Sequence, residues 1–162
     1  MKRLPRKYHK LRNQKLDLAI LARGGIRLYH RDTALGHDVY LLAKKRYQII
    51  EFDGNYLSSK AELLFELEQK LKLPPVGNNY DRFNDYLYDF STGDNGVVLV
   101  FRHLHKLELE VLYILLDMLA FHTRRKIVTG QKLLTLVQLP SRFFSFKEPI
   151  GALNFELWND IE

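Results

Sequence analysis

The stretch that decides the fold is residues 71–90, LKLPPVGNNYDRFNDYLYDF, in which two prolines are followed by a pattern typical of a short helix. Its apolar residues recur at intervals of three and four, at Tyr80, Phe83, Leu87 and Phe90. Asp81, Asp85 and Asp89 also step by four, and at about 100° per residue they form a stripe on the opposite side. The sequence therefore predicts a helix that opens near Asn79, with one apolar face and one acidic face.

The acidic stripe has two interpretations. Like charges four residues apart on a helix repel each other by a few tenths of a kcal/mol per pair, and only Arg82 lies nearby to relieve this. A solvated helix face explains the stripe without any function. The alternative is that the carboxylates are kept for a partner, and both interpretations stay open at this point.

On either side of this helix the chain alternates between strand and helix patterns. Strands are expected at 47–52, 97–101 and 133–139, and helices at 59–71, 79–90 and 107–123. Ser59 and Glu62 have the spacing of a capping box, and Arg124-Arg125-Lys126 is interpreted as a basic loop. Because helical crossovers return the chain in the same direction, we expect an α/β fold with a small three-stranded parallel sheet packed with helices.

Charge divides the chain into a basic leader and a mildly acidic body. Residues 1–46 hold thirteen Lys/Arg and three Asp/Glu, whereas residues 47–162 hold twelve and sixteen, which together give the net charge of +6. The leader is predicted to contain a short helix or strand at 16–22, a strand at 26–29 and a helix at 34–46 capped by Asp32 or Thr33. We therefore divide the chain into a partly helical basic N-terminal extension (1–46), an α/β domain (47–139) and an aromatic-rich C-terminal tail (140–162) that packs on the domain.

Several classes of function are disfavoured by what the sequence lacks. It has no cysteine, so disulfides and thiolate metal sites are impossible, and no fixed spacing completes a metal site around His103, His105 and His122. No phosphate-binding glycine loop or serine-nucleophile motif is present, so we expect no cofactor, no metal and no enzyme. The longest apolar run, 111–121, is too short to span a bilayer, and we expect a cytoplasmic protein without a membrane segment.

A family resemblance rests on the central stretch. Leu73-Pro74 ends one helix, and Gly77, Asn79, Asp81 and Asp85 then follow in the pattern Gly-x-Asn-x-Asp-x-x-x-Asp. Over residues 47–139 this order of elements and this motif resemble the family of barstar, the intracellular inhibitor of the bacterial ribonuclease barnase. The run 111–117, which ends at Asp117, matches a later helix on which the family carries an acidic residue.

The resemblance implies an inhibitor, immunity protein or antitoxin whose acidic helix occupies the active site of a basic bacterial ribonuclease or nuclease toxin as a phosphate mimic. It implies the following partner-binding residues: Asp85 as the central contact, Asp81 and Asp89 beside it, Asp117 as a flanking contact, and Gly77 and Asn79 shaping the entry loop. Pro75, Val76 and Asn84 stand where the family has aromatic residues. We expect the free protein to be a monomer.

A second hypothesis places the function in the leader. Residues 1–46 interleave Lys and Arg with Tyr8, Tyr29 and Tyr40, a composition suited to contacts with phosphates and bases. Under this hypothesis the chain is a nucleic-acid-associated protein, and its binding is weakly sequence-specific and sensitive to salt.

Overall fold

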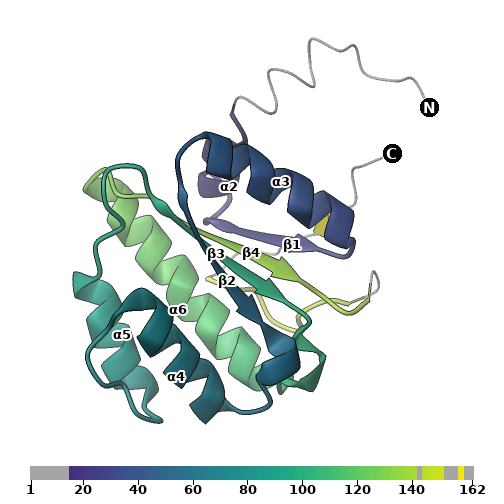
Figure 1. Cartoon of the computed structure of the whole chain (residues 1–162), viewed down its shortest axis with the longest axis vertical. Coiled ribbons are helices and arrows are strands. Elements are labelled where there is room, and N and C mark those ends of the chain that lie inside the picture. The colour runs from purple at the N-terminus through teal and green to yellow at the C-terminus, as the bar shows by residue number, and fades with distance from the viewer. Residues whose placement is uncertain (1–14, 142–143, 152–156, 159–162) are drawn as a thin grey trace.

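A parallel β-sheet runs through the middle of the molecule, with helices on both of its faces (Figure 1). The structure is a computed structural model that describes residues 15–141, 144–151 and 157–158. The strands are β1 (Ile26–Tyr29), β2 (Gln48–Asp53), β3 (Val97–Arg102), β4 (Leu133–Gln138) and the two-residue β5 (Leu157–Trp158). They lie in the order β2-β3-β4-β1-β5, and every neighbouring pair is parallel.

The prediction of a three-stranded sheet is wrong, because the sheet has four long strands and a short fifth at its edge. The additional long strand, β1, pairs with β4 in the register that places Ile26 opposite Thr135. It comes from the basic leader, where the sequence predicted a strand at 26–29 but assigned it to a separate extension and not to the sheet. The division at residue 46 stays a prediction, although β1 shares one sheet with β2, β3 and β4.

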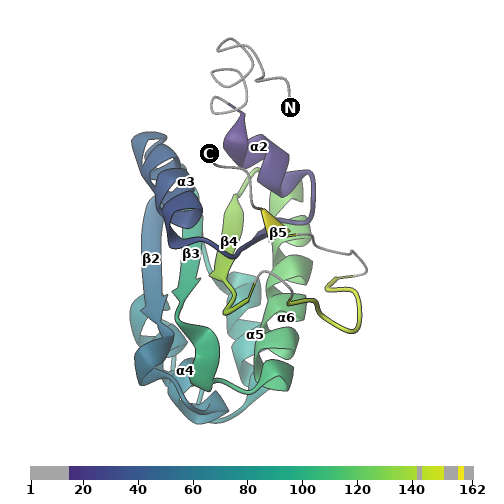
Figure 2. The same ribbon diagram turned by 90° about the vertical axis from the view of Figure 1, so that its right-hand side faces the viewer.

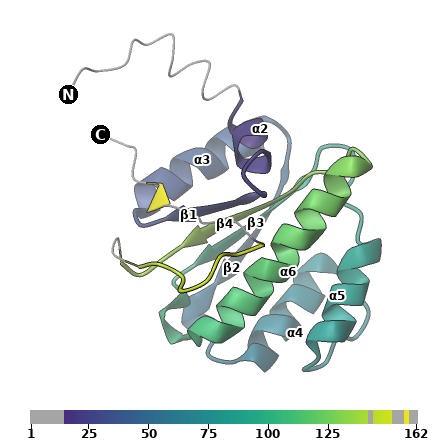
Figure 3. The ribbon, with the colours of Figure 1, turned by 180° about the vertical axis from the view of Figure 1, so that it is seen from behind.

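Helices cover the two faces unequally. The helices are α2 (Leu16–Leu21), α3 (Asp32–Lys44), α4 (Lys60–Leu71), α5 (Tyr80–Asp89) and α6 (Leu109–Val128). Figures 2 and 3 show α2 and α3 on one side of the sheet and α4, α5 and α6 on the other. The α/β class expected from the alternating pattern is confirmed.

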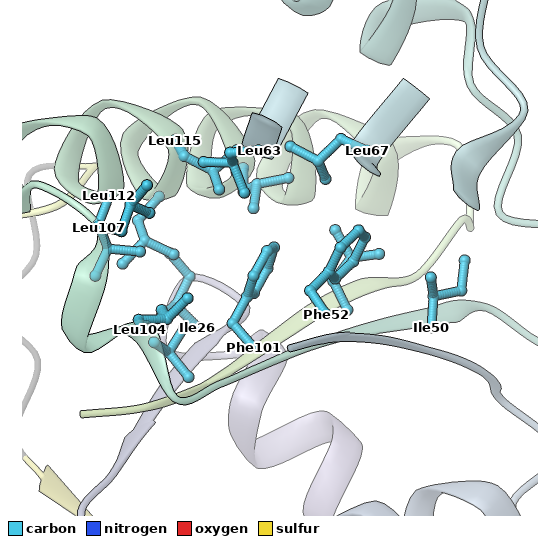
Figure 4. Packing of buried hydrophobic residues seen from close by; sticks show 14 of the residues in the cluster. Ile26, Ile50, Phe52, Leu63, Leu67, Phe101, Leu104, Leu107, Leu112 and Leu115 are labelled. Carbon is cyan, nitrogen blue, oxygen red and sulfur yellow. The ribbon is translucent and has the colours of Figure 1, made fainter. Parts of the chain in front are cut away.

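Two apolar layers hold this sandwich together. The larger layer lies between the sheet and α4, α5 and α6, where the rings of Phe52 and Phe101 stack with their centroids 4.7 Å apart beneath Leu63 and Leu67 (Figure 4). The smaller layer packs Leu35 and other residues of α2 and α3 against the opposite face of β3 and β4. Alternate residues of these strands therefore serve different layers, which explains their continuously apolar sequences.

The helices α3 to α6 lie in the predicted segments, although α3 begins and ends two residues earlier than predicted, α6 begins two residues later, and three further details differ. Ser59 caps α4 by accepting from the Glu62 N–H at 3.2 Å, but the Glu62 carboxylate reaches Ser58 rather than Ser59. The N-cap position of α3 is Arg31 and carries no side-chain cap, so the cap expected of the next two residues is absent. The predicted basic loop 124–126 is the last turns of α6, because nothing breaks the helix before Gly130 and basic side chains suit its negative end.

Some described residues of the C-terminal segment contact the body, and the packing of the tail as a whole stays a prediction. Phe144 and Phe146 are half-buried against the larger layer, and β5 pairs with β1. Phe143 and Phe155, on which the expectation also rested, lie outside the described residues. No helix in the described segments is long and apolar enough to cross a membrane.

Candidate functional site

The candidate site is built on α5 and the loop that leads into it. After α4 the chain turns at Lys72, which has a positive φ of 54°. Val76 then inserts its side chain into the core, and its N–H donates to the Glu68 carboxylate at 2.7 Å. Gly77 is exposed with a φ of 64°, a backbone conformation that favours glycine. These contacts fix the loop against α4 and so set the point at which α5 begins.

The first turn of α5 is closed by Asn79, as the sequence predicts. Its side-chain oxygen accepts from the Arg82 N–H at 3.1 Å, which satisfies one of the free amides at the start of the helix. Asn79 thus has a defined structural task, and the helix opens at the expected residue.

The two opposed faces predicted for α5 are confirmed. Phe83 and Leu87 are fully buried, and Tyr80 and Phe90 are half-buried beside them. On the opposite side lie the three aspartates of the acidic stripe, which we define as Asp81, Asp85 and Asp89; all three are exposed. Within the described part of the chain none of them forms a hydrogen bond or an ion pair. The carboxylates are therefore available to an external partner.

Contacts along one side of α5 hold it on α6, and we call this line of contact the α5–α6 seam (Figure 3). Asn84 accepts from the Nε2 of His122 at 2.8 Å, and the Nζ of Lys126 donates to the carbonyl of Phe90. The guanidinium of Arg125 lies over the Tyr88 ring. Because these contacts span the helix from its middle to its end, α5 presents the acidic stripe in one orientation.

The electrostatics of the seam keep its histidine neutral. Burial lowers the pKa of His122 to about 4, and the positive charges of Lys126 and Arg125 act in the same direction. Burial also lowers the pKa of Lys126, an effect that Arg125 strengthens and the carboxylate of Asp89 opposes. Of the three acids of the stripe, Asp89 is thus the one whose charge acts on the lysine of the seam, without an ion pair between them.

Asp117 is not brought together with the acidic stripe. Its carboxylate accepts from the N–H of Gly151 at 2.8 Å, so it holds the C-terminal segment on α6. His122, which faces α5, follows Asp117 by five positions, or about 140° around the helix axis. The proposed role of Asp117 as a flanking contact stays a prediction, and its place in the fold gives it a structural role.

The histidines that the sequence offers as metal candidates do not form a metal-binding cluster within the described residues. In the described ranges no three His, Asp or Glu side chains are arranged to hold a metal ion. His103 instead lies 3.0 Å from the carboxylate of Asp53. A depression of about 260 Å³ beside the start of α4 is lined by both Lys60 and Glu108, so it has no single charge preference.

Sequence reasoning missed two residues next to the stripe. Tyr88 of α5 and Phe121 of α6 are 55% and 51% exposed, which is unusual for large aromatic side chains beside a seam. Helical periodicity could have placed Tyr88 outside the apolar face. Nothing in the sequence, however, shows which side of α6 meets α5, so the position of Phe121 required the structure.

The fold and this surface define a parallel α/β protein whose outer helix carries an unpaired acidic stripe. Residues 47–126 match the family model described as Barstar (barnase inhibitor), so this segment of the chain is a barstar-like domain.

Comparison with solved structures finds a likeness to the crystal structure of Cdc6p from Pyrobaculum aerophilum, with a TM-score of 0.51 and 17% sequence identity. The match covers 86% of this chain and 40% of that chain, so this chain spans less than half the length of that protein. At this identity the likeness concerns the fold alone. No curated protein matches the sequence.

Proposed function

We propose that this chain is an inhibitor, of the immunity-protein or antitoxin kind, that blocks the active site of a basic bacterial ribonuclease with α5. It acts by binding and not as an enzyme, and Asp85, at the centre of the stripe, is its main contact. The single observation that carries the proposal is the acidic stripe, exposed and unpaired within the described residues of a barstar-family domain.

The physical basis is charge complementarity. A ribonuclease active site holds phosphate with Arg, Lys and His, and carboxylates at i and i+4 of a helix can occupy the same positions through charge-assisted hydrogen bonds. The capped first turn and the seam hold α5 in place before binding, so little conformational entropy is lost. Asp81 and Asp89 add attraction at a distance and speed association.

The test is inhibition of RNA cleavage by purified barnase-type ribonucleases. The wild-type chain should inhibit, and Asp85→Asn should weaken binding by about 2–5 kcal/mol, the range for truncating one partner of a buried charge pair, the barnase–barstar complex among the measured cases. Asp32→Asn is the control for loss of an acid elsewhere, because Asp32 is exposed on α3 across the sheet, where it pairs with Arg102. An Asp85→Asn variant as potent as wild type would remove α5 from the binding site.

A second candidate function, nucleic-acid binding through residues 1–46, is favoured by one described feature. Lys15, Arg23, Lys44 and Arg46 are exposed, whereas the nearby Asp17 is already paired with Lys45. In the same assays, salt-sensitive binding of a labelled RNA by the wild-type chain, without inhibition of any nuclease, would favour this function over the first.

A further inference from the structure

Two exposed aromatic side chains lie on the side of the acidic stripe that faces α6. Tyr88 is 55% and Phe121 is 51% exposed, so each leaves about half of a large apolar side chain in water. Exposed apolar residues scattered singly need no explanation, but neighbouring ones mark interaction sites. These two residues therefore indicate an interaction site only if they lie close to each other.

Contacts across the α5–α6 seam place them on the same side. The rings of Phe121 and His122 pack edge to face, with their centroids 5.2 Å apart. His122 in turn donates a hydrogen bond to Asn84, which lies one turn before Tyr88. Arg125, one turn after Phe121, lies over the ring of Tyr88. The two aromatic residues thus belong to one network, which we call the seam aromatic pair.

The pair adjoins the acidic stripe on one side only. Around α5, Tyr88 lies about 60° from Asp85 and about 20° from Asp81, because successive residues turn by about 100°. The guanidinium of Arg125 lies over the ring of Tyr88, so part of this ring is already covered. A cationic partner is attracted to the stripe, and the seam aromatic pair lies next to the stripe on the side that faces α6.

The positions where the family carries aromatic residues cannot supply an apolar anchor here. Val76 is fully buried in the core, Pro75 is not aromatic, and Asn84 is engaged with His122. Protein interfaces draw most of their binding energy from a few residues, commonly Trp, Tyr and Arg, in desolvated pockets. An interface on α5 that lacked such an anchor would depend on its charged contacts alone.

We propose that Tyr88 and Phe121 form the apolar anchor of the α5 interface, shifted from the loop before Gly77 to the α5–α6 seam. The partner is a basic nuclease that presents an apolar pocket next to its phosphate-binding cations. This inference rests on the proposed function, because the acidic stripe selects the partner and the aromatic pair holds it. Tyr88 and Phe121 are then contact residues that set affinity and specificity.

The experiment measures association and dissociation of the same ribonucleases with Tyr88→Ala, Phe121→Ala and the double variant. Tyr56→Ala and Phe65→Ala are matched controls, because these residues are 79% and 60% exposed on η1 (Gly54–Tyr56) and α4. The double variant should dissociate at least tenfold faster, whereas the controls should match the wild type. Tyr88→Phe should retain most of the affinity, since the ring remains.

Measurements at several salt concentrations distinguish the contribution of the seam aromatic pair to binding from that of the acidic stripe. The loss caused by the double variant should persist at high salt, because apolar contact is not screened, whereas the loss caused by Asp81→Asn, whose charge acts at a distance, should shrink. If Asp85→Asn weakens binding and the double variant equals the controls, the anchor is contradicted and the proposed function stands. If the wild-type chain inhibits no barnase-type nuclease, the proposed function fails and the anchor with it. Thermal unfolding of each variant verifies that the fold is retained.

Discussion

At the scale of single residues, His122 determines most directly how α5 sits on α6. Its Nε2–H donates to Asn84, while its Nδ1 is buried without a partner in the described structure. The sequence singles this histidine out only as a weak metal candidate. Its actual contact, with a residue 38 positions earlier in the chain, depends on two helices meeting and is invisible to any local pattern.

The first prediction at this scale concerns pH. The folded-state pKa of His122 is about 4, against about 6.5 for an unperturbed histidine. Between these values the unfolded chain binds the proton and the folded chain does not, so stability falls as pH drops from 6.5 to 4 and is fully present above 6.5. The 2.5-unit difference corresponds to about 3 kcal/mol.

Denaturant unfolding of the wild type and of His122→Gln at pH 7, 5.5 and 4 checks this. Glutamine can still donate to Asn84 but does not titrate, so the free energy of unfolding should fall less steeply with acid in the variant. The comparison uses the slope with pH, which is independent of any overall loss of stability. Parallel curves for the two proteins would show that His122 does not titrate as described.

At the scale of the element, α5 is a ten-residue helix that depends on its surroundings. Isolated helices of this length are marginal in water, so its stability comes from the buried Phe83 and Leu87 and from its cap. The acidic stripe forms no ion pair within the described structure, and the first turn must offset part of its self-repulsion. Asn79 is therefore a sensitive position.

We predict that Asn79→Ala lowers the free energy of unfolding by about 1 kcal/mol, the usual cost of losing an N-cap. Asn79→Asp should restore most of it, because a carboxylate can accept the same Arg82 N–H and suits the positive end of the helix. Asn78→Ala is the control, since Asn78 is exposed and precedes the cap. Equal stability of Asn79→Ala and Asn78→Ala in urea titrations would argue against capping by Asn79.

At the scale of the whole molecule, the basic leader is part of the sheet. β1 lies between β4 and β5, and α2 and α3 cover the face of the sheet opposite α5. Buried side chains of β3 and β4, Val98, Val100, Leu134 and Leu136, would lose this cover if the leader were absent. The chain therefore contains more structure than the segment that matches the family.

We predict that deletion of residues 1–46 abolishes cooperative thermal unfolding, because it exposes an apolar sheet face and the edge of β4. Calorimetry of the truncated chain against the full chain provides the measurement. A cooperative transition in the 47–162 fragment would instead support the domain division made from the sequence.

The sequence by itself determined the elements with strong local signals. The helix at α5, its start at Asn79, the parallel α/β class and the barstar-like family all follow from periodicity, capping and a motif, which act between residues close in the chain. Only the tertiary structure decided that β1 joins the sheet, that Asp117 holds the C-terminal segment, and that Tyr88 and Phe121 both lie along the α5–α6 seam. These facts depend on contacts between distant segments, and a periodic pattern shows which face of an element is buried but not what it is buried against.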